Sequence, residues 1–137
     1  MAKTRIGSLP PRYSFFLNPY SDERFSRCPK CRRPTNFRKF ALLIHVDPKG
    51  LIPLRKTSRY CPVCELVIVH QDELEPQLLS ILSKYDPRKI GNPYCVIGTL
   101  DLNVWKTGIH SSLTFEQIRE HATDFKYQLT FTPSDES

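Results

Sequence analysis

The chain has 137 residues, including 20 Lys or Arg, 14 Asp or Glu, 12 Pro and 5 Cys, and its formal net charge is +6. With 39% hydrophobic residues, this composition excludes an intrinsically disordered chain, and the length allows a conventional core. The longest apolar runs, residues 40–46 and 66–69, are far too short to cross a bilayer. Because the N-terminal residues also show no secretory signal pattern, we expect a cytoplasmic protein without a membrane partner.

Positive charge is concentrated in the first half of the chain. Through Cys64 there are 14 basic and 3 acidic residues, a balance of +11, whereas from Glu65 onward there are 6 basic and 11 acidic residues, a balance of −5. A basic half is typical of a surface that meets phosphate or another polyanion, while an acidic half faces away from it or recruits a protein partner. The alternative interpretation is that the cations only solvate a small module.

Residues 1–25 are predicted to form an N-terminal arm in which aromatic residues alternate with arginines. The aromatic residues are Tyr13, Phe15, Phe16, Tyr20 and Phe25, and the arginines in and beside the arm are Arg12, Arg24 and Arg27. Rings between guanidinium groups suit single-stranded nucleic acid, because bases stack on the rings while the cations meet phosphate. For Phe15 and Phe16 we favour the alternative that they pack the arm onto the body of the protein.

Two Cys-Pro-x-Cys pairs, separated by 29 residues, come after the arm. They consist of Cys28, Cys31, Cys61 and Cys64. In a reducing compartment this spacing predicts a metal site, because two intervening residues let one turn of backbone aim both sulfurs at a single ion. Four thiolates complete a tetrahedron that leaves no position for substrate, so we predict a structural Zn²⁺. Eight of the twelve prolines precede residue 63, and metal binding would supply folding energy to this loop-rich half.

The residues immediately after each cysteine pair disfavour a redox role. A redox-active Cys-x-x-Cys begins a helix after a strand, where the helix dipole lowers the thiol pKa. Here Cys31 is followed by Arg-Arg-Pro-Thr, and Cys64 is followed by a strand-like run. Cys95 has no cysteine partner nearby in the sequence, and we interpret it as a small buried hydrophobic residue outside the site.

The residues between and after the cysteine pairs predict a β-hairpin with a third strand. Residues 37–46 are rich in apolar and β-forming types, residues 47–50 read Asp-Pro-Lys-Gly, and residues 51–60 return toward the second pair. Residues 65–70 are expected to form the third strand.

Two Cys-Pro-x-Cys knuckles around a hairpin resemble a zinc ribbon over about residues 26–70, and we predict a zinc-ribbon domain over residues 26–71. It implies a structural zinc ion and a role either in nucleic-acid contact or in protein docking. Residues 18–73, from Asn-Pro-Tyr to His-Gln-Asp-Glu, also look like unannotated bacterial zinc-ribbon proteins, which implies no activity. Because Arg32 and Glu65 stand where ribbons commonly have glycine, we expect the knuckle turns to be distorted.

The cysteine spacing is also similar to that of rubredoxins, which hold iron in four thiolates and transfer electrons. A tetrahedron of thiolates admits either metal. The missing glycines and the basic surface make this iron protein the less favoured alternative.

Ten cations on or near the knuckles are the predicted nucleic-acid contacts. Those near the first knuckle are Arg24, Arg27, Lys30, Arg32, Arg33, Arg38 and Lys39, and those on the returning strand are Arg55, Lys56 and Arg59. A hairpin would bring the two sets together. Since zinc with four thiolates carries a net charge of about −2, a few of these cations are expected to balance the site.

Residues 72–132 predict a small α+β unit in the order helix, strand, helix, strand. The helices are expected over residues 72–85 and 114–123, where Thr114 and Gln117 form a capping box, and the strands over residues 94–100 and 127–132. Residues 133–137 form a polar tail. The predicted fold class is therefore α+β, with an N-terminal zinc ribbon.

The four histidines, His45, His70, His110 and His121, lie in no recognisable catalytic motif. We therefore predict a non-catalytic, zinc-binding protein that binds DNA or RNA through its basic ribbon. The alternative is a protein-interaction module, in which the zinc is structural and the cations dock an acidic protein surface.

Overall fold

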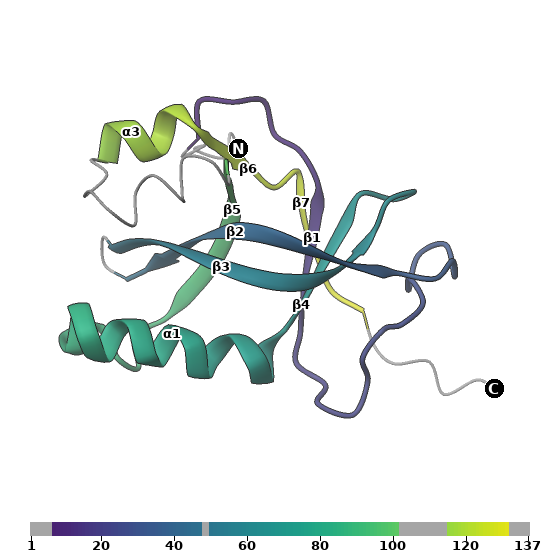
Figure 1. Cartoon of the computed structure of the whole chain (residues 1–137), viewed down its shortest axis with the longest axis horizontal. Coiled ribbons are helices and arrows are strands. Elements are labelled where there is room, and N and C mark those ends of the chain that lie inside the picture. The colour runs from purple at the N-terminus through teal and green to yellow at the C-terminus, as the bar shows by residue number, and fades with distance from the viewer. Residues whose placement is uncertain (1–6, 48–49, 102–114, 132–137) are drawn as a thin grey trace.

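In the computed structural model, which describes residues 7–47, 50–101 and 115–131, strands predominate and form one curled sheet with few helices (Figure 1). The strands are β1 Ser14–Asn18, β2 Asn36–Val46, β3 Gly50–Cys61, β4 Leu66–His70, β5 Tyr94–Leu100, β6 Ala122–Asp124 and β7 Tyr127–Leu129. The helices are α1 Gln71–Tyr85, the 3₁₀ turn η1 Pro87–Lys89 and α3 Phe115–Glu120. The protein therefore has a mixed α and β fold.

The predicted hairpin is present as β2–β3, and it lies at the centre of the sheet. The two strands pair antiparallel from Asn36 opposite Tyr60 to Val46 opposite Gly50. β4 then pairs antiparallel with β3, with Cys61 opposite Leu66, and confirms the predicted third strand. The tip of the hairpin, residues 48–49, lies outside the described residues.

The sheet extends on both sides of this hairpin in the order β6-β5-β2-β3-β4-β1-β7. β1 is parallel to both β4 and β7, and β5 is antiparallel to β2 and β6. The short strands β6 and β7 follow one another in the chain but pair near opposite ends of the sheet, so the sheet curls back toward itself. Residues 1–25, 26–71 and 72–132, which the sequence analysis separates, therefore all contribute strands to one sheet.

The main core lies between one face of the sheet and helix α1. Alternate residues of β2 point into it, among them Leu42 and Ile44, and α1 contributes Leu74, Leu78 and Leu82. The predicted helix over residues 72–85 is confirmed, and the helical spacing of these leucines places them on its buried face. In Figure 1, α1 and α3 lie on opposite sides of the β2–β3 hairpin.

The opposite face of the sheet carries two smaller clusters. In one cluster, Phe16, Phe25 and Ile68 pack against the cysteines. In the other, Ile118 of α3 packs with Leu43 of β2. Phe15 lies in the main core and Phe16 in the cysteine cluster, since successive residues of a strand face opposite sides. The packing interpretation of this aromatic pair is therefore confirmed, and the pair sits in a strand of the sheet.

Three local predictions differ from the structure. The second helix ends at Glu120 because the chain turns there to pair β6 with β5, and its predicted cap Thr114 lies outside the described residues. The last strand ends at Leu129, and residues 133–137 lie outside the described residues. Cys95 is exposed, so its interpretation as a buried residue was wrong.

Within the described ranges, no helix combines the length and the apolar character needed to cross a membrane.

We expect Leu78→Ala to destabilise the fold by about 2–5 kcal/mol, because it opens a cavity between α1 and the sheet. Leu79→Ala, at the next position, is the matched control: Leu78 is 5% exposed and Leu79 is 49% exposed. Urea unfolding of the metal-loaded protein measures both variants. Equal destabilisation by the two substitutions would contradict this assignment of the core.

Candidate metal centre

The four paired cysteines converge at one end of the hairpin. Cys28 and Cys31 lie in the loop before β2, Cys61 is the last residue of β3, and Cys64 lies in the turn before β4. All four Sγ atoms lie within 4.8 Å of one another.

The distances between the sulfurs match a tetrahedral metal site. The Sγ atoms of Cys28 and Cys64 are 3.9 Å apart, and those of Cys31 and Cys61 are 3.5 Å apart. Metal–sulfur bonds of about 2.3 Å in a tetrahedron place sulfurs about 3.8 Å apart. A disulfide would require about 2.05 Å, and all four cysteines are free thiols. The four cysteines are therefore positioned to bind one metal ion.

Each cysteine pair forms a tight turn with backbone N–H groups directed at sulfur. The Lys30 N–H donates to Cys28 Sγ at 3.4 Å, and the Cys64 N–H donates to Cys61 Sγ at 3.5 Å. The residue after each turn, Arg32 with φ 67° and Glu65 with φ 51°, adopts the left-handed conformation that favours glycine. The turns are therefore formed without glycine, at a cost of about 1 kcal/mol or more for each such residue.

Neighbouring contacts hold these two left-handed residues in place. The Glu65 carboxylate forms an ion pair with Arg12 at 3.1 Å, and the Glu65 carbonyl accepts the Ser14 N–H at 2.9 Å. The Arg32 carbonyl accepts a side-chain hydrogen bond from Arg27 at 3.2 Å. These bonds tie both turns to adjacent segments and offset part of the backbone strain.

The cysteines are part of the core. Cys28 and Cys61 are fully buried against Phe16, Phe25 and Leu66, while Cys31 and Cys64 are half-buried. A metal ion bound here would fasten the loop between β1 and β2 to the sheet. With four sulfurs around it, the ion has no open coordination position, which is typical of a structural site.

The thiols differ in acidity because their surroundings differ. Burial raises the pKa of Cys28, and burial together with the neighbouring thiols raises the pKa of Cys64 to about 12. A hydrogen bond from the Arg33 backbone lowers the pKa of Cys31 to about 7. Metal ions bind the thiolate form, so a metal must displace protons from the buried members of the set.

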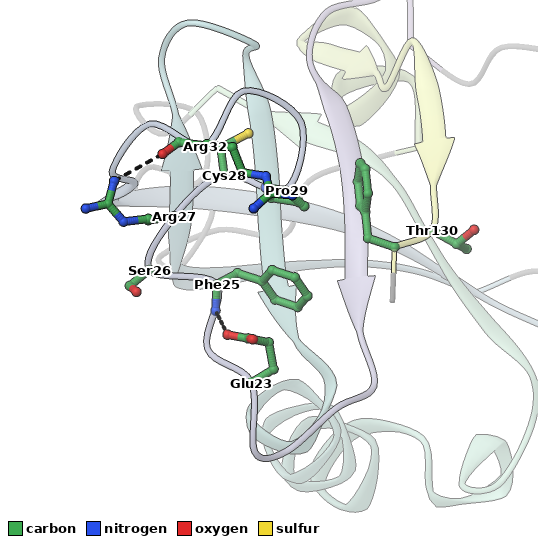
Figure 2. A pocket seen from close by; sticks show the side chains of 9 residues that line it. Glu23, Phe25, Ser26, Arg27, Cys28, Pro29, Arg32 and Thr130 are labelled. Carbon is green, nitrogen blue, oxygen red and sulfur yellow. Dashed lines mark hydrogen bonds between the residues drawn. The ribbon is translucent and has the colours of Figure 1, made fainter. Parts of the chain in front are cut away.

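A cavity of about 510 Å³ opens beside the first knuckle, between the Glu23 to Arg32 loop and the chain at Thr130 (Figure 2). Figure 2 shows two hydrogen bonds that shape this loop, from Arg27 to the Arg32 carbonyl and from the Phe25 N–H to the Glu23 carboxylate. Arg27, Cys28 and Arg32 line the cavity, so it borders the metal centre.

The ten predicted nucleic-acid contacts fall into separate groups. Arg24 pairs with Asp72 at 2.9 Å and Lys56 with Glu73 at 2.7 Å, so both cations are neutralised at the start of α1. Arg38 lies over a group of aromatic rings, with its guanidinium 4.9 Å from the centre of the Phe40 ring. These contacts hold two of the cations at α1 and the third on the aromatic rings.

The remaining cations lie around the first knuckle and on the outer face of the hairpin. The knuckle group is Arg27, Lys30, Arg32 and Arg33, and the hairpin group is Lys39, Arg55 and Arg59. Arg27, Lys30, Arg32, Arg33, Lys39 and Arg55 are exposed, while Arg59 is half-buried. The structure also reveals a residue that the sequence analysis treated only as part of a strand: Phe37 is 64% exposed beside the hairpin group. The sequence signal for this exposure was the position of Phe37 among polar residues, in the run Asn36 to Lys39.

Comparison with protein-family models, curated proteins and solved structures finds no match to this chain.

Replacing Cys61 by Ser is expected to reduce the bound metal from one ion per chain to almost none and to abolish cooperative unfolding, because it removes a buried ligand. Cys95→Ser, at an exposed cysteine outside the cluster, is the control and should retain the metal. Elemental analysis and thermal melts measure both properties. A Cys61→Ser protein with unchanged metal content would show that the four sulfurs do not form the site.

Metal affinity should fall steeply with acidification below pH 7. Cys28, Cys64 and, below its pKa of about 7, Cys31 are protonated in the metal-free protein, so protons compete with the metal as the pH falls. We expect the affinity constant to drop by about three powers of ten or more per pH unit. Competition with a zinc-chelating dye between about pH 6 and 7 measures this slope. A pH-independent affinity would contradict thiolate ligation.

Proposed function

We propose that the protein is a zinc-ribbon protein that binds nucleic acid through the basic surface around a structural zinc ion. The ribbon comprises the two knuckles and the strands β2, β3 and β4 within residues 26–71. Zinc is favoured because it takes four thiolates in a closed tetrahedron, and the separations of 3.5 and 3.9 Å between sulfurs suit that geometry. A reducing cytoplasmic setting, which belongs to the same proposal, keeps the thiols free for metal.

The observation that carries the nucleic-acid proposal is unneutralised positive charge beside the metal centre. Among the described residues, no carboxylate lies within ion-pair distance of Lys30, Arg33 or Lys39, whereas Arg24 and Lys56 are paired with acids of α1. Zinc with four thiolates carries a net charge of about −2, which is less than the combined charge of these three cations. Clustered unpaired cations release counterions when phosphates replace those ions, which drives binding to a polyanion.

A non-catalytic role accompanies this proposal. The four thiolates would occupy every coordination position of the zinc, leaving none at which the ion could activate water or substrate. The zinc would instead hold the knuckle and its cations against the hairpin.

The double substitution Lys30→Ser with Arg33→Ser should weaken binding to labelled DNA or RNA and reduce the slope of log affinity against log salt by about two. The matched control removes the exposed cations Lys84 and Arg88 from the α1 side of the molecule by the same two changes to Ser. Fluorescence anisotropy over a salt series measures both variants, after their metal content has been verified. Equal behaviour of the two double variants would exclude the knuckle as a phosphate-binding surface and favour protein docking instead.

A further inference from the structure

The outer face of the hairpin carries a continuous row of cationic and aromatic side chains. Directly opposed residues of an antiparallel pair share a face, and the register opposes Phe37 to Arg59, Lys39 to Thr57 and Ala41 to Arg55. Ala41 is buried, while Lys39, Thr57 and Arg55 are exposed. The row contains three cations and one aromatic ring, and it includes no acidic residue.

Phe37 is held in this row as a fixed, open platform. The Arg59 guanidinium lies 4.0 Å from the centre of its ring, while the ring remains 64% exposed. Arg59 Nε is buried and has no hydrogen-bond partner among the described residues, and its Nη1 reaches Thr35 Oγ1 only at 3.5 Å. Stacking on Phe37, more than hydrogen bonding, therefore sets the position of this guanidinium.

The row begins at the metal centre. Cys61 follows Arg59 by two residues on the same strand and therefore points to the same face. Side chains on this face recur every ~7 Å along β3, so Arg59, Thr57 and Arg55 lead stepwise away from the cysteines. Cys61 of the second knuckle and the Phe37 platform thus lie on the same face of the hairpin.

We propose that the Phe37 ring is a stacking site for a base of single-stranded nucleic acid, with Lys39 and Arg55 contacting its phosphates. This inference rests on the nucleic-acid binding proposed above and specifies the form of the ligand. A duplex keeps its bases stacked inside and presents phosphates and grooves, whereas a single strand presents phosphates together with free base faces. An exposed ring flanked by cations complements the single strand.

Phe37→Ala in the full, zinc-loaded chain tests the platform. We expect affinity for short labelled oligo-thymidylate and oligo-uridylate to fall roughly tenfold or more, with little change for a duplex of equal length. The salt slope should not change, because the substitution removes no charge. Phe37→Trp should retain binding, and Phe37→Leu, which keeps apolar bulk but has no aromatic face, should lose it even if Phe37→Ala is poorly folded.

Tyr127→Ala is the matched control for the removal of an exposed aromatic residue. Tyr127 is 62% exposed and lies on β7, three strands away from β3 in the sheet order. Its loss should leave single-strand affinity unchanged. If Phe37→Leu binds single strands like the wild type while Lys30→Ser with Arg33→Ser weakens binding, the platform is overturned and the proposed function stands. If the wild type shows no salt-dependent binding to any of these probes, both proposals fail.

Discussion

The convergence of four sulfurs at one end of the hairpin is the constraint on which the rest of the structure depends. Two of the sulfurs come from the loop before β2 and two from the connection between β3 and β4, so a shared ion would close the loop onto the sheet. Two knuckle residues other than glycine adopt the left-handed backbone conformation despite its energetic cost, so the surrounding structure must hold the knuckle geometry in place. Burial of Cys28 and Cys61 among aromatic rings makes the metal site and the core one unit.

In this arrangement, the cations of the first half of the chain fall into two groups with different roles. Some of the cations serve the fold: Arg12 holds Glu65 at the second knuckle, and Arg24 and Lys56 hold the first turn of α1. Others stand at the knuckle and on the outer face of the hairpin. The local excess of charge at these places, rather than the net charge of the whole chain, is what would attract a polyanion.

Sequence reasoning predicted the parts of this structure that depend on short-range pattern. The cysteine cluster follows from the spacing of two residues within each pair, the hairpin from β-forming runs around a turn, and α1 from the helical recurrence of Leu74, Leu78 and Leu82.

The position of β1 could not be predicted in this way. Its parallel pairing with β4 joins residues about fifty positions apart, and no local signal encodes that pairing. The same limit applies to the ion pairs of Arg24 and Lys56, whose acidic partners belong to a different element, and to the exposure of Phe37, which depends on which face of the sheet is covered.

The most direct test of the account is a titration of isotope-labelled, zinc-loaded protein with a short single-stranded oligonucleotide, followed by NMR amide shifts. The account predicts that the perturbed amides cluster at the first knuckle and on the strand residues around Phe37, Lys39 and Thr57, and that added salt reverses the shifts. Shifts confined to α1 and η1, or no shifts at low salt, would contradict a basic, metal-organised surface for nucleic acid.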